Sequence, residues 1–358
     1  MKKIILFIIL MFFTTGCYDY MELNDLSIIS GIAIDKEDNK YKVTYEILSD
    51  QKEGKESSTS KAITVNGTGS SIADAFTNAS KEVSKLAFYP HVKVLVLSKE
   101  IAKEKMFDIV DYVLRSPRIR NEFYVVISKE EKASDIFTKA SDDINVVSSQ
   151  IETMIKNNPR RKNNASTYTF EKVAEQFLNK RTDTVITTVS LKNKDISIDG
   201  LAVFKDYKLN GFLSSDKAYG YNILTKNAKN IQYTFGCGEN KNITLSIYDA
   251  EPKIKVNSKN SISINIDTKA SIVEYNCDKS LKDPNTYDYF NKKYHSKINK
   301  NIEDFYKEIL NRKTDILGIE DIYYRNTRKD IDWTKLDYKI NTTLKINNAG
   351  LIFEVKKW

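Results

Sequence analysis

The chain has 358 residues, of which 41% are hydrophobic and 29% are charged, and this balance excludes a disordered or fibrous protein. Its length is sufficient for two or three domains, each with its own core. The formal net charge is +8, but lysine is spread along the whole chain, which favours a generally solvated surface over a nucleic-acid-binding patch.

The first 16 residues have the pattern of an export signal. Lys2 and Lys3 form a short positive region, and residues 4–13 are an apolar run that is too short to span a membrane. Small residues then precede Cys17, an order typical of a lipoprotein signal peptide. We predict cleavage after residue 16 and a diacylglyceryl anchor on Cys17, whose two acyl chains would hold the mature chain stably at a membrane. An uncleaved anchor and a plain secretory leader are the alternatives.

Strands and helices are predicted to alternate from residue 26 to about residue 180. Residues 26–35 and 41–49 are rich in β-branched and aromatic residues and flank a turn-forming stretch, which predicts a hairpin. After a polar loop at 51–61, further strands are predicted at 62–67, 91–98 and 121–128. Helical patterns follow these strands, and the alternation predicts an α/β layer.

Two of these helices are predicted from apolar residues spaced three and four positions apart. The first opens at Ser71, which resembles the start of a capping box with Asp74 in place of glutamate. The expected apolar face of this helix is Ile72, Phe76, Ala79, Val83 and Leu86. The apolar residues of the second helix are Ile101, Phe107, Val110, Val113 and Leu114.

Strands dominate the chain from residue 184 onward. They are predicted at 184–192, 195–205 and 208–213, and apolar residues occupy alternate positions again at 254–266 and 336–346. This period of two predicts antiparallel strands with one buried face. One long helix, with its apolar stripe at 298–310, interrupts them.

These patterns predict an α+β fold of several domains. We place the domain boundary near residues 181–196. The predicted division is a signal peptide at 1–16, an N-terminal alternating strand/helix domain at 17–190, and a C-terminal region at 191–358. That last region combines an antiparallel sheet with one long helix and has room for two subdomains.

Cys237 and Cys277 are the two cysteines outside the leader. They could pair only if the fold brings their Cα atoms within about 7 Å. Because three cysteines do not make a disulfide framework, we interpret both as buried small apolar residues.

The chain contains no recognisable catalytic or metal-binding motif. His91 and His295 are far apart and lie outside any metal or nucleophile pattern, so structural roles are expected. The glycines of residues 66–71 precede a helix and could cradle a phosphate, but they lack the lysine and the spacing of a phosphate loop. Asp142 and Asp143 could act as an acid/base pair, although adjacent carboxylates are more often solvated. We therefore predict no cofactor, no metal and no enzymatic activity.

Two basic clusters each contain a proline and are therefore predicted to be loops. The cationic residues of the first are Arg115, Arg118 and Arg120, and those of the second are Arg160, Arg161 and Lys162. Arginine pairs bidentately with carboxylates and phosphates. Lipid headgroups, an acidic partner surface and plain solvent all remain open for both clusters.

Long, ordered motifs extend along most of the chain. Cys17 is followed by an aromatic residue and Asp19, then by ELNDL at 22–26 and by GIAID at 31–35. Further motifs lie at 67–104, 114–129, 199–214, 314–326 and 332–333. In these motifs the chain resembles the GerAC-type family, the lipoprotein C subunits of spore germinant receptors. Tyr18 departs from the family, which usually has tryptophan there.

The resemblance implies a non-enzymatic component of a nutrient germinant receptor. It implies a lipid anchor on the outer face of the spore inner membrane, integral-membrane A- and B-type partner subunits, and an α/β architecture of several domains. One alternative is a solute-binding lipoprotein of a transporter, which predicts two similar lobes around a cleft. Another is an anchored enzyme, which would need convergent polar groups with perturbed pKa values.

Overall fold

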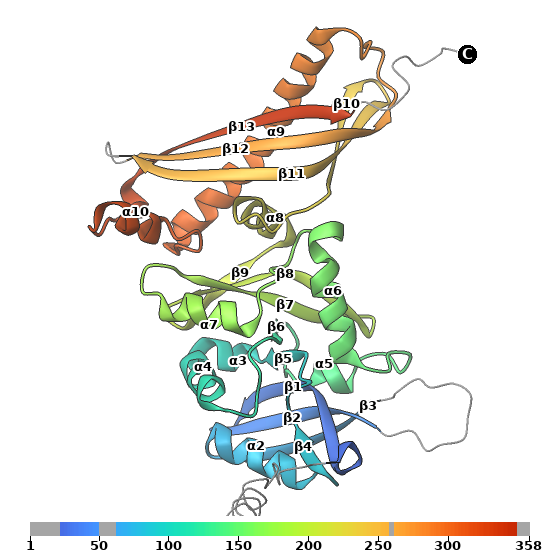
Figure 1. Cartoon of the computed structure of the whole chain (residues 1–358), viewed down its shortest axis with the longest axis vertical. Helices are drawn as coiled ribbons and strands as arrows, with labels where there is room; N and C mark the ends of the chain where they lie inside the picture. The colour runs from blue at the N-terminus through green and yellow to red at the C-terminus, as the bar shows by residue number, and fades with distance from the viewer. Residues whose placement is uncertain (1–21, 50–61, 258–260, 349–358) are drawn as a thin grey trace, which may run out of the picture.

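A computed structural model describes residues 22–49, 62–257 and 261–348. The predicted signal peptide and Cys17 lie outside these residues. The described chain is a mixed α/β molecule with two β-sheets arranged one beyond the other along its long axis (Figure 1). Among the described helices, none is long and apolar enough to cross a membrane.

The first sheet has nine strands in the order β3-β2-β1-β5-β6-β7-β8-β9, with β4 beside the start of β1. The strands are β1 (Leu26–Glu37), β2 (Lys40–Leu48), β3 (Ala62–Gly69), β4 (Leu86–Phe88), β5 (Val94–Leu97), β6 (Tyr124–Ser128), β7 (Thr184–Lys192), β8 (Asp195–Lys205) and β9 (Lys208–Leu213). The central strands β1, β5, β6 and β7 are parallel, and antiparallel pairs flank them. The predicted hairpin of β1 and β2 is confirmed.

Helices cover both faces of this sheet, as expected for parallel strands. They are α2 (Ile72–Lys81), α3 (Lys99–Glu104), α4 (Met106–Arg115), α5 (Asp135–Thr138), α6 (Val147–Arg161) and α7 (Phe170–Leu178), with a short 3₁₀ turn η1 (Leu23–Asp25) before β1. Successive residues of β1 alternate between the two faces. Ile32 and Ile34 pack with α2, α3, α4 and α7, whereas Ala33 packs with α5 and α6.

Two predicted helices differ from the structure. The helix that opens at Ser71 ends at Lys81, and Leu86 instead begins β4. Pairing of β4 with β1 overrides the helical spacing of the local sequence. The second predicted helix is divided into α3 and α4 at Lys105, and its residues Phe107 and Leu114 are exposed rather than buried.

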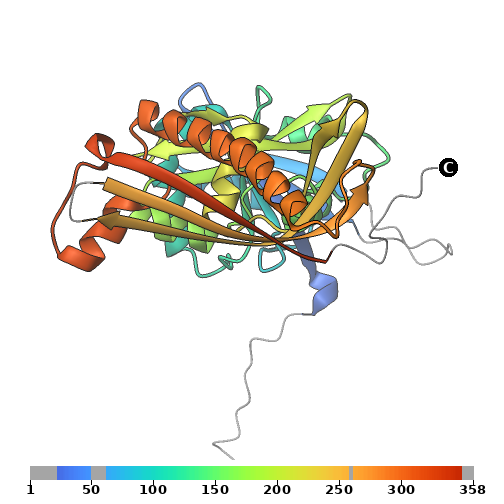
Figure 2. The ribbon, with the colours of Figure 1, turned by 90° about the horizontal axis from the view of Figure 1, so that it is seen from above.

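The second sheet has four strands in the order β10-β11-β12-β13. Its strands and helices are α8 (Ser215–Leu224), β10 (Ile231–Gly238), β11 (Lys241–Asn257), β12 (Ser261–Tyr275), α9 (Pro284–Arg312), α10 (Ile319–Thr327), the 3₁₀ turn η2 (Trp333–Lys335) and β13 (Asp337–Asn348). Helix α9 lies along one face of this sheet (Figure 2). The prediction of antiparallel pairing is wrong for β12 and β13, which are parallel, because α9 and α10 return the chain to the end where β12 began.

The long helix α9 starts at Pro284, well before the apolar stripe that predicted it. Proline is favoured at the first helical position, where no N–H is needed. Asp283 caps the helix by accepting a hydrogen bond from the Asn285 N–H at 2.9 Å. The predicted stripe itself is confirmed, since Ile298, Ile302, Phe305, Tyr306 and Ile309 are buried and Leu310 is partly buried.

Cys237 and Cys277 form a disulfide, with their Cα atoms 5.7 Å apart. The interpretation of both as unpaired apolar residues is therefore wrong. Strands β10 and β12 pair with opposite edges of β11. Gly236, which precedes Cys237, pairs with Asn242, and Tyr275, which lies two residues before Cys277, pairs with Ile243, so the two cysteines lie at the same end of the sheet. The 40-residue separation of the two cysteines in the sequence does not reveal this arrangement of three strands.

The two sheets share a hydrophobic core. Val185, Leu201, Val203 and Leu213 belong to the first sheet, yet they pack in one cluster with α8, α9 and the second sheet. The Arg312 side chain of α9 also donates a hydrogen bond to the Asn210 carbonyl of β9 at 2.7 Å. The proposed boundary at 190/191 falls within β7 and stays a prediction.

Candidate functional site

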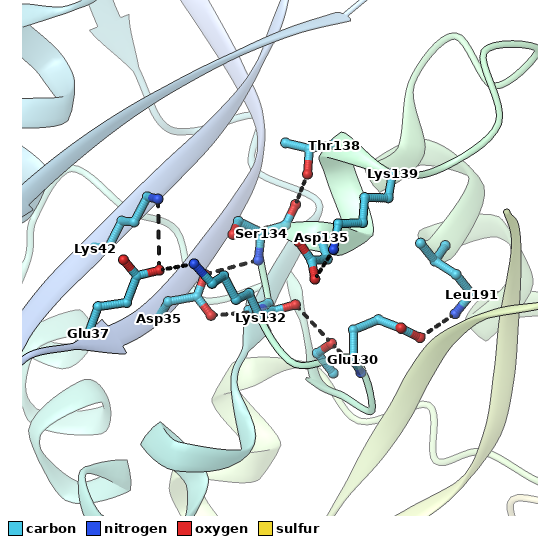
Figure 3. Close-up of polar contacts among 12 residues, drawn as sticks. Asp35, Glu37, Lys42, Glu130, Lys132, Ser134, Asp135, Thr138, Lys139 and Leu191 are labelled. Atoms are coloured by element: carbon cyan, nitrogen blue, oxygen red, sulfur yellow. Dashed lines mark hydrogen bonds and ion pairs between the residues drawn. The ribbon is translucent and has the colours of Figure 1, made fainter.

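The 31–35 motif at the end of β1 holds a buried carboxylate before helix α5. Asp35 accepts hydrogen bonds from the N–H groups of Ala133 at 2.6 Å and Ser134 at 3.0 Å (Figure 3). Burial raises the pKa of Asp35, although these two hydrogen bonds act in the opposite direction. The carboxylate joins β1 to the turn that starts α5, so this motif is accounted for by the fold.

The surroundings of Asp35 support the same structural reading. Glu37 forms ion pairs with Lys132 at 2.9 Å and Lys42 at 3.8 Å (Figure 3). The hydrogen bond from Lys132 lowers the pKa of Glu37, and such exposed pairs contribute little to stability. On β2, the buried Glu46 carboxylate accepts a hydrogen bond from the Val147 N–H at 2.6 Å, at the start of α6. Two acidic side chains thus satisfy two helix N-termini.

The glycines of residues 66–71 make room for helix α2. A Cβ atom at Gly67 would lie 2.0 Å from the Ala79 backbone nitrogen, and one at Gly69 would lie 2.3 Å from that of Ala75. The space beside these glycines is therefore filled by the helix and not left for a phosphate. The predicted cap is confirmed, since Ser71 Oγ accepts a hydrogen bond from the Asp74 N–H at 3.1 Å.

Two of the family-like motifs, residues 67–104 and 114–129, meet at an exposed groove beside β4. The groove has a volume of about 580 Å³ and lies between β4 and the turn that follows α4. Its principal lining residues are Lys85, Leu86, Phe88, Tyr89, Pro117 and Arg118. We call this surface the β4 groove. Leu86 is 60% exposed and forms part of the apolar surface of this groove.

A smaller pocket of about 140 Å³ adjoins the β4 groove and shares Ser80, Tyr89 and Arg118 with it. Phe76 and Tyr112 form much of its wall, with their rings 4.8 Å apart. A partly buried hydrogen bond holds the pocket wall, because the Tyr89 hydroxyl lies 2.7 Å from Ser80 Oγ. Burial also raises the pKa of Tyr112 to about 12.

Of the first basic cluster, Arg118 lines the β4 groove, and Arg115 and Arg120 do not. Arg115 ends α4 and pairs with Asp111 at 2.8 Å, so its predicted loop position is wrong, whereas Arg118 and Arg120 lie in the turn as predicted. Arg120 and His91 line a neighbouring hollow of about 270 Å³. Neither Arg118 nor Arg120 forms an ion pair with another described residue.

The second basic cluster lies elsewhere and is largely helical. Arg160 and Arg161 belong to α6, which continues through Pro159, and Lys162 follows as its cap. The loop prediction is wrong because Pro159 stands in the last turn, where the Asn158 carbonyl still accepts a hydrogen bond from the Lys162 N–H at 3.1 Å. The structure therefore does not bring the two basic clusters together.

The other candidate residues are distributed over the molecule. His295 lies on α9, where its Nδ1 is 2.7 Å from Thr342 Oγ1 of β13. Burial lowers the pKa of His295, which suits a neutral structural histidine. Asp142 and Asp143 are exposed, as expected for solvated carboxylates. The predicted candidates thus do not converge on one catalytic centre within the described residues.

Sequence reasoning missed a pair of carboxyl groups where the two sheets meet. Asp183 accepts a hydrogen bond from the Asp315 N–H at 2.6 Å, and Asp315 caps α10 by accepting one from the Ile319 N–H at 2.9 Å. Burial raises the pKa of Asp183 to about 6 and that of Asp315 to about 7. The available signal was an aspartate four residues before the start of a helical pattern.

Comparison with known proteins identifies the family. Residues 19–191 match the family model described as the spore germination protein N-terminal domain, and residues 199–350 match the model described as spore germination B3/GerAC like, C-terminal. The chain belongs to the GerAC-type family of spore germination proteins. The resemblance to the C subunits of germinant receptors is therefore confirmed.

Individual GerAC-type relatives match the chain over most of its length. It is 24% identical to spore germination protein GerQC of Bacillus cereus, over 98% of this chain and 99% of the relative. It is 25% identical to spore germination protein KC of Bacillus subtilis (strain 168), over 90% of this chain and 86% of the relative. The crystal structure of the GerBC protein has a TM-score of 0.54 at 18% identity and covers 89% of this chain and 97% of that one. This structural likeness confirms the mixed α/β fold.

Proposed function

We propose that this GerAC-type protein is a non-enzymatic, lipid-anchored subunit of a nutrient germinant receptor. It would act in spore germination by contacting the integral-membrane A- and B-type subunits and helping to transmit ligand occupancy. The observation that carries this proposal is the pair of family models, which together extend from residue 19 to residue 350.

The anchor is proposed at Cys17, on the outer face of the membrane. Glu22, where the described chain begins, is only five positions after Cys17. Since an extended chain spans at most ~3.6 Å per residue, Glu22 would lie within about 18 Å of the lipidated cysteine. The end of the first sheet that carries η1 and β4 would therefore face the bilayer.

The distribution of perturbed carboxyl groups supports a role in contact rather than catalysis. Asp35 is bound by backbone N–H groups inside the fold, and so are Asp183 and Asp315. Asp183 and Asp315 line one hollow of about 300 Å³, but backbone N–H groups bind one oxygen of Asp183 and both oxygens of Asp315 there, and Asp35 does not line this hollow. The two sheets also differ in strand number and order, unlike the similar lobes expected of a solute-binding lipoprotein.

The proposal is tested by affinity purification of the tagged chain from detergent-solubilised spore membranes. We expect two multi-span proteins, identified by mass spectrometry as A- and B-type subunits, to copurify. Cys17→Ala should move the chain to the soluble fraction or mislocalise it. Tyr18→Trp keeps the cysteine and restores the residue usual in the family, so it should leave membrane retention unchanged.

The lipid anchor and the partner subunits are tested by separate results, and each could prove wrong on its own. Retention of Cys17→Ala in the membrane, at the level of Tyr18→Trp, would show that the lipid anchor is not at this cysteine. Copurification of a transporter's membrane subunit in place of germinant-receptor subunits would favour the solute-binding alternative.

A further inference from the structure

The outer edge of β4 is open. Residues Leu86–Phe88 pair in parallel with residues 26–28 of β1, and no other described strand pairs with β4. An unpaired strand edge presents N–H and C=O groups to any extended segment that reaches it. Such segments bind by adding a strand, with their side chains entering pockets at alternate positions.

The apolar surface beside this edge fits a peptide segment. The β4 groove exposes Leu86 and leads into the adjoining pocket of about 140 Å³. A cavity of about 150 Å³ holds a benzene molecule, so the pocket has the capacity for one phenylalanine or leucine side chain. A pocket the size of one side chain next to an open strand edge favours a protein ligand over the surface of a lipid bilayer.

The charges around the β4 groove indicate an acidic segment. Lys85 and Arg118 line the groove, and Arg118 also lines the adjoining pocket. Among the described residues, no carboxylate lines either hollow. An acidic side chain in the bound segment would pair with the Arg118 guanidinium, whose planar donors suit a carboxylate.

From these features we propose that the β4 groove binds an extended segment of a membrane subunit of the receptor. The segment adds a strand to β4, places one large apolar side chain in the adjoining pocket and directs an acidic side chain at Arg118. This inference rests on the proposed function. Its placement agrees with the tether, because Leu26, the β1 partner of Leu86, is nine residues from Cys17 and thus within about 32 Å of it.

The test uses the full-length tagged chain in spore membranes. Leu86→Glu and Arg118→Glu should each reduce recovery of the membrane subunits by about tenfold, as for the loss of a central interface contact. Leu178→Glu is the matched control, because Leu178 is 61% exposed, against 60% for Leu86, and lies at the end of α7 outside the groove. This control should retain wild-type recovery.

Folding is checked on the same purified proteins in detergent. The melting temperatures of Leu86→Glu and Arg118→Glu should agree with that of Leu178→Glu within about 2 °C, as expected for surface substitutions that leave the fold intact. A photoreactive residue at position 86 should then crosslink to a segment of a membrane subunit outside its membrane spans. The same residue at position 178 should not.

The outcomes separate this inference from the proposed function. If the wild-type chain recovers no membrane subunit, the proposed function fails, and the inference fails with it. If the wild type and Leu86→Glu recover the subunits equally, the proposed function stands and the β4 groove is not the binding site. Crosslinks from position 86 to lipid alone would also overturn the inference.

Discussion

Replacing Asp35 by alanine tests whether the 31–35 motif serves the fold. The substitution removes both oxygens that accept hydrogen bonds from the N–H groups of Ala133 and Ser134. Each buried donor left without a partner costs ~1–3 kcal/mol, so we expect a loss of about 2–5 kcal/mol in the free energy of unfolding. Part of this loss is offset, because alanine also removes a carboxyl group whose charged form is disfavoured by burial, as the raised pKa of Asp35 shows.

The assay is urea unfolding of the purified chain, followed by far-ultraviolet circular dichroism. Asp35→Asn should lose less, about 1–3 kcal/mol, because its amide oxygen still accepts one of the two hydrogen bonds. Asp142→Ala is the control: it removes an exposed aspartate and should change the free energy of unfolding by no more than ~0.5 kcal/mol. Equal unfolding curves for Asp35→Ala and Asp142→Ala would refute the structural role of Asp35.

Three further predictions concern other parts of the fold. Replacing Cys237 and Cys277 by serine should destabilise the C-terminal half by about 4 kcal/mol, from the chain entropy of a loop closed across 40 residues, as measured by urea unfolding with and without reductant. Gly67→Ala should cost more than ~3 kcal/mol by the same measurement, because its Cβ would overlap the backbone of α2, and a smaller loss would show that α2 can move away. Burial raises the folded-state pKa of Asp183 to about 6 and that of Asp315 to about 7, so their contribution to stability should fall as pH rises from 4 to 8, and Asp315→Asn should flatten that slope in thermal melts.

Local sequence signals predicted much of the fold. The β1–β2 hairpin, the Ser71 cap and the apolar stripe of α9 each depend on residues close in the chain, and all three are confirmed. The errors have long-range causes. Leu86 is a strand residue because β1 pairs with it, and β13 is parallel because two helices return the chain across the sheet.

The candidate surface shows the same limit. Arg118, Arg120 and His91 could be recognised in family-like motifs, but the sequence did not say whether they belong to the core or to an interface. The position of Arg118 beside an open strand depends on the pairing of Leu26 with Leu86, residues that are distant along the chain. The disulfide was missed for a related reason, since it depends on two strands that flank a third.

The core shared by the two sheets has a consequence for synthesis and export of the chain. A nascent chain that has emerged only to Leu213 contains every strand of the first sheet, yet Val185, Leu201 and Val203 still lack the cover that α8 and α9 provide. Such a chain presents an uncovered apolar sheet face to the solvent, which is prone to aggregation. A fragment truncated after β9 should therefore precipitate when expressed alone, and the full chain should require a holding chaperone until α9 has folded against the sheet.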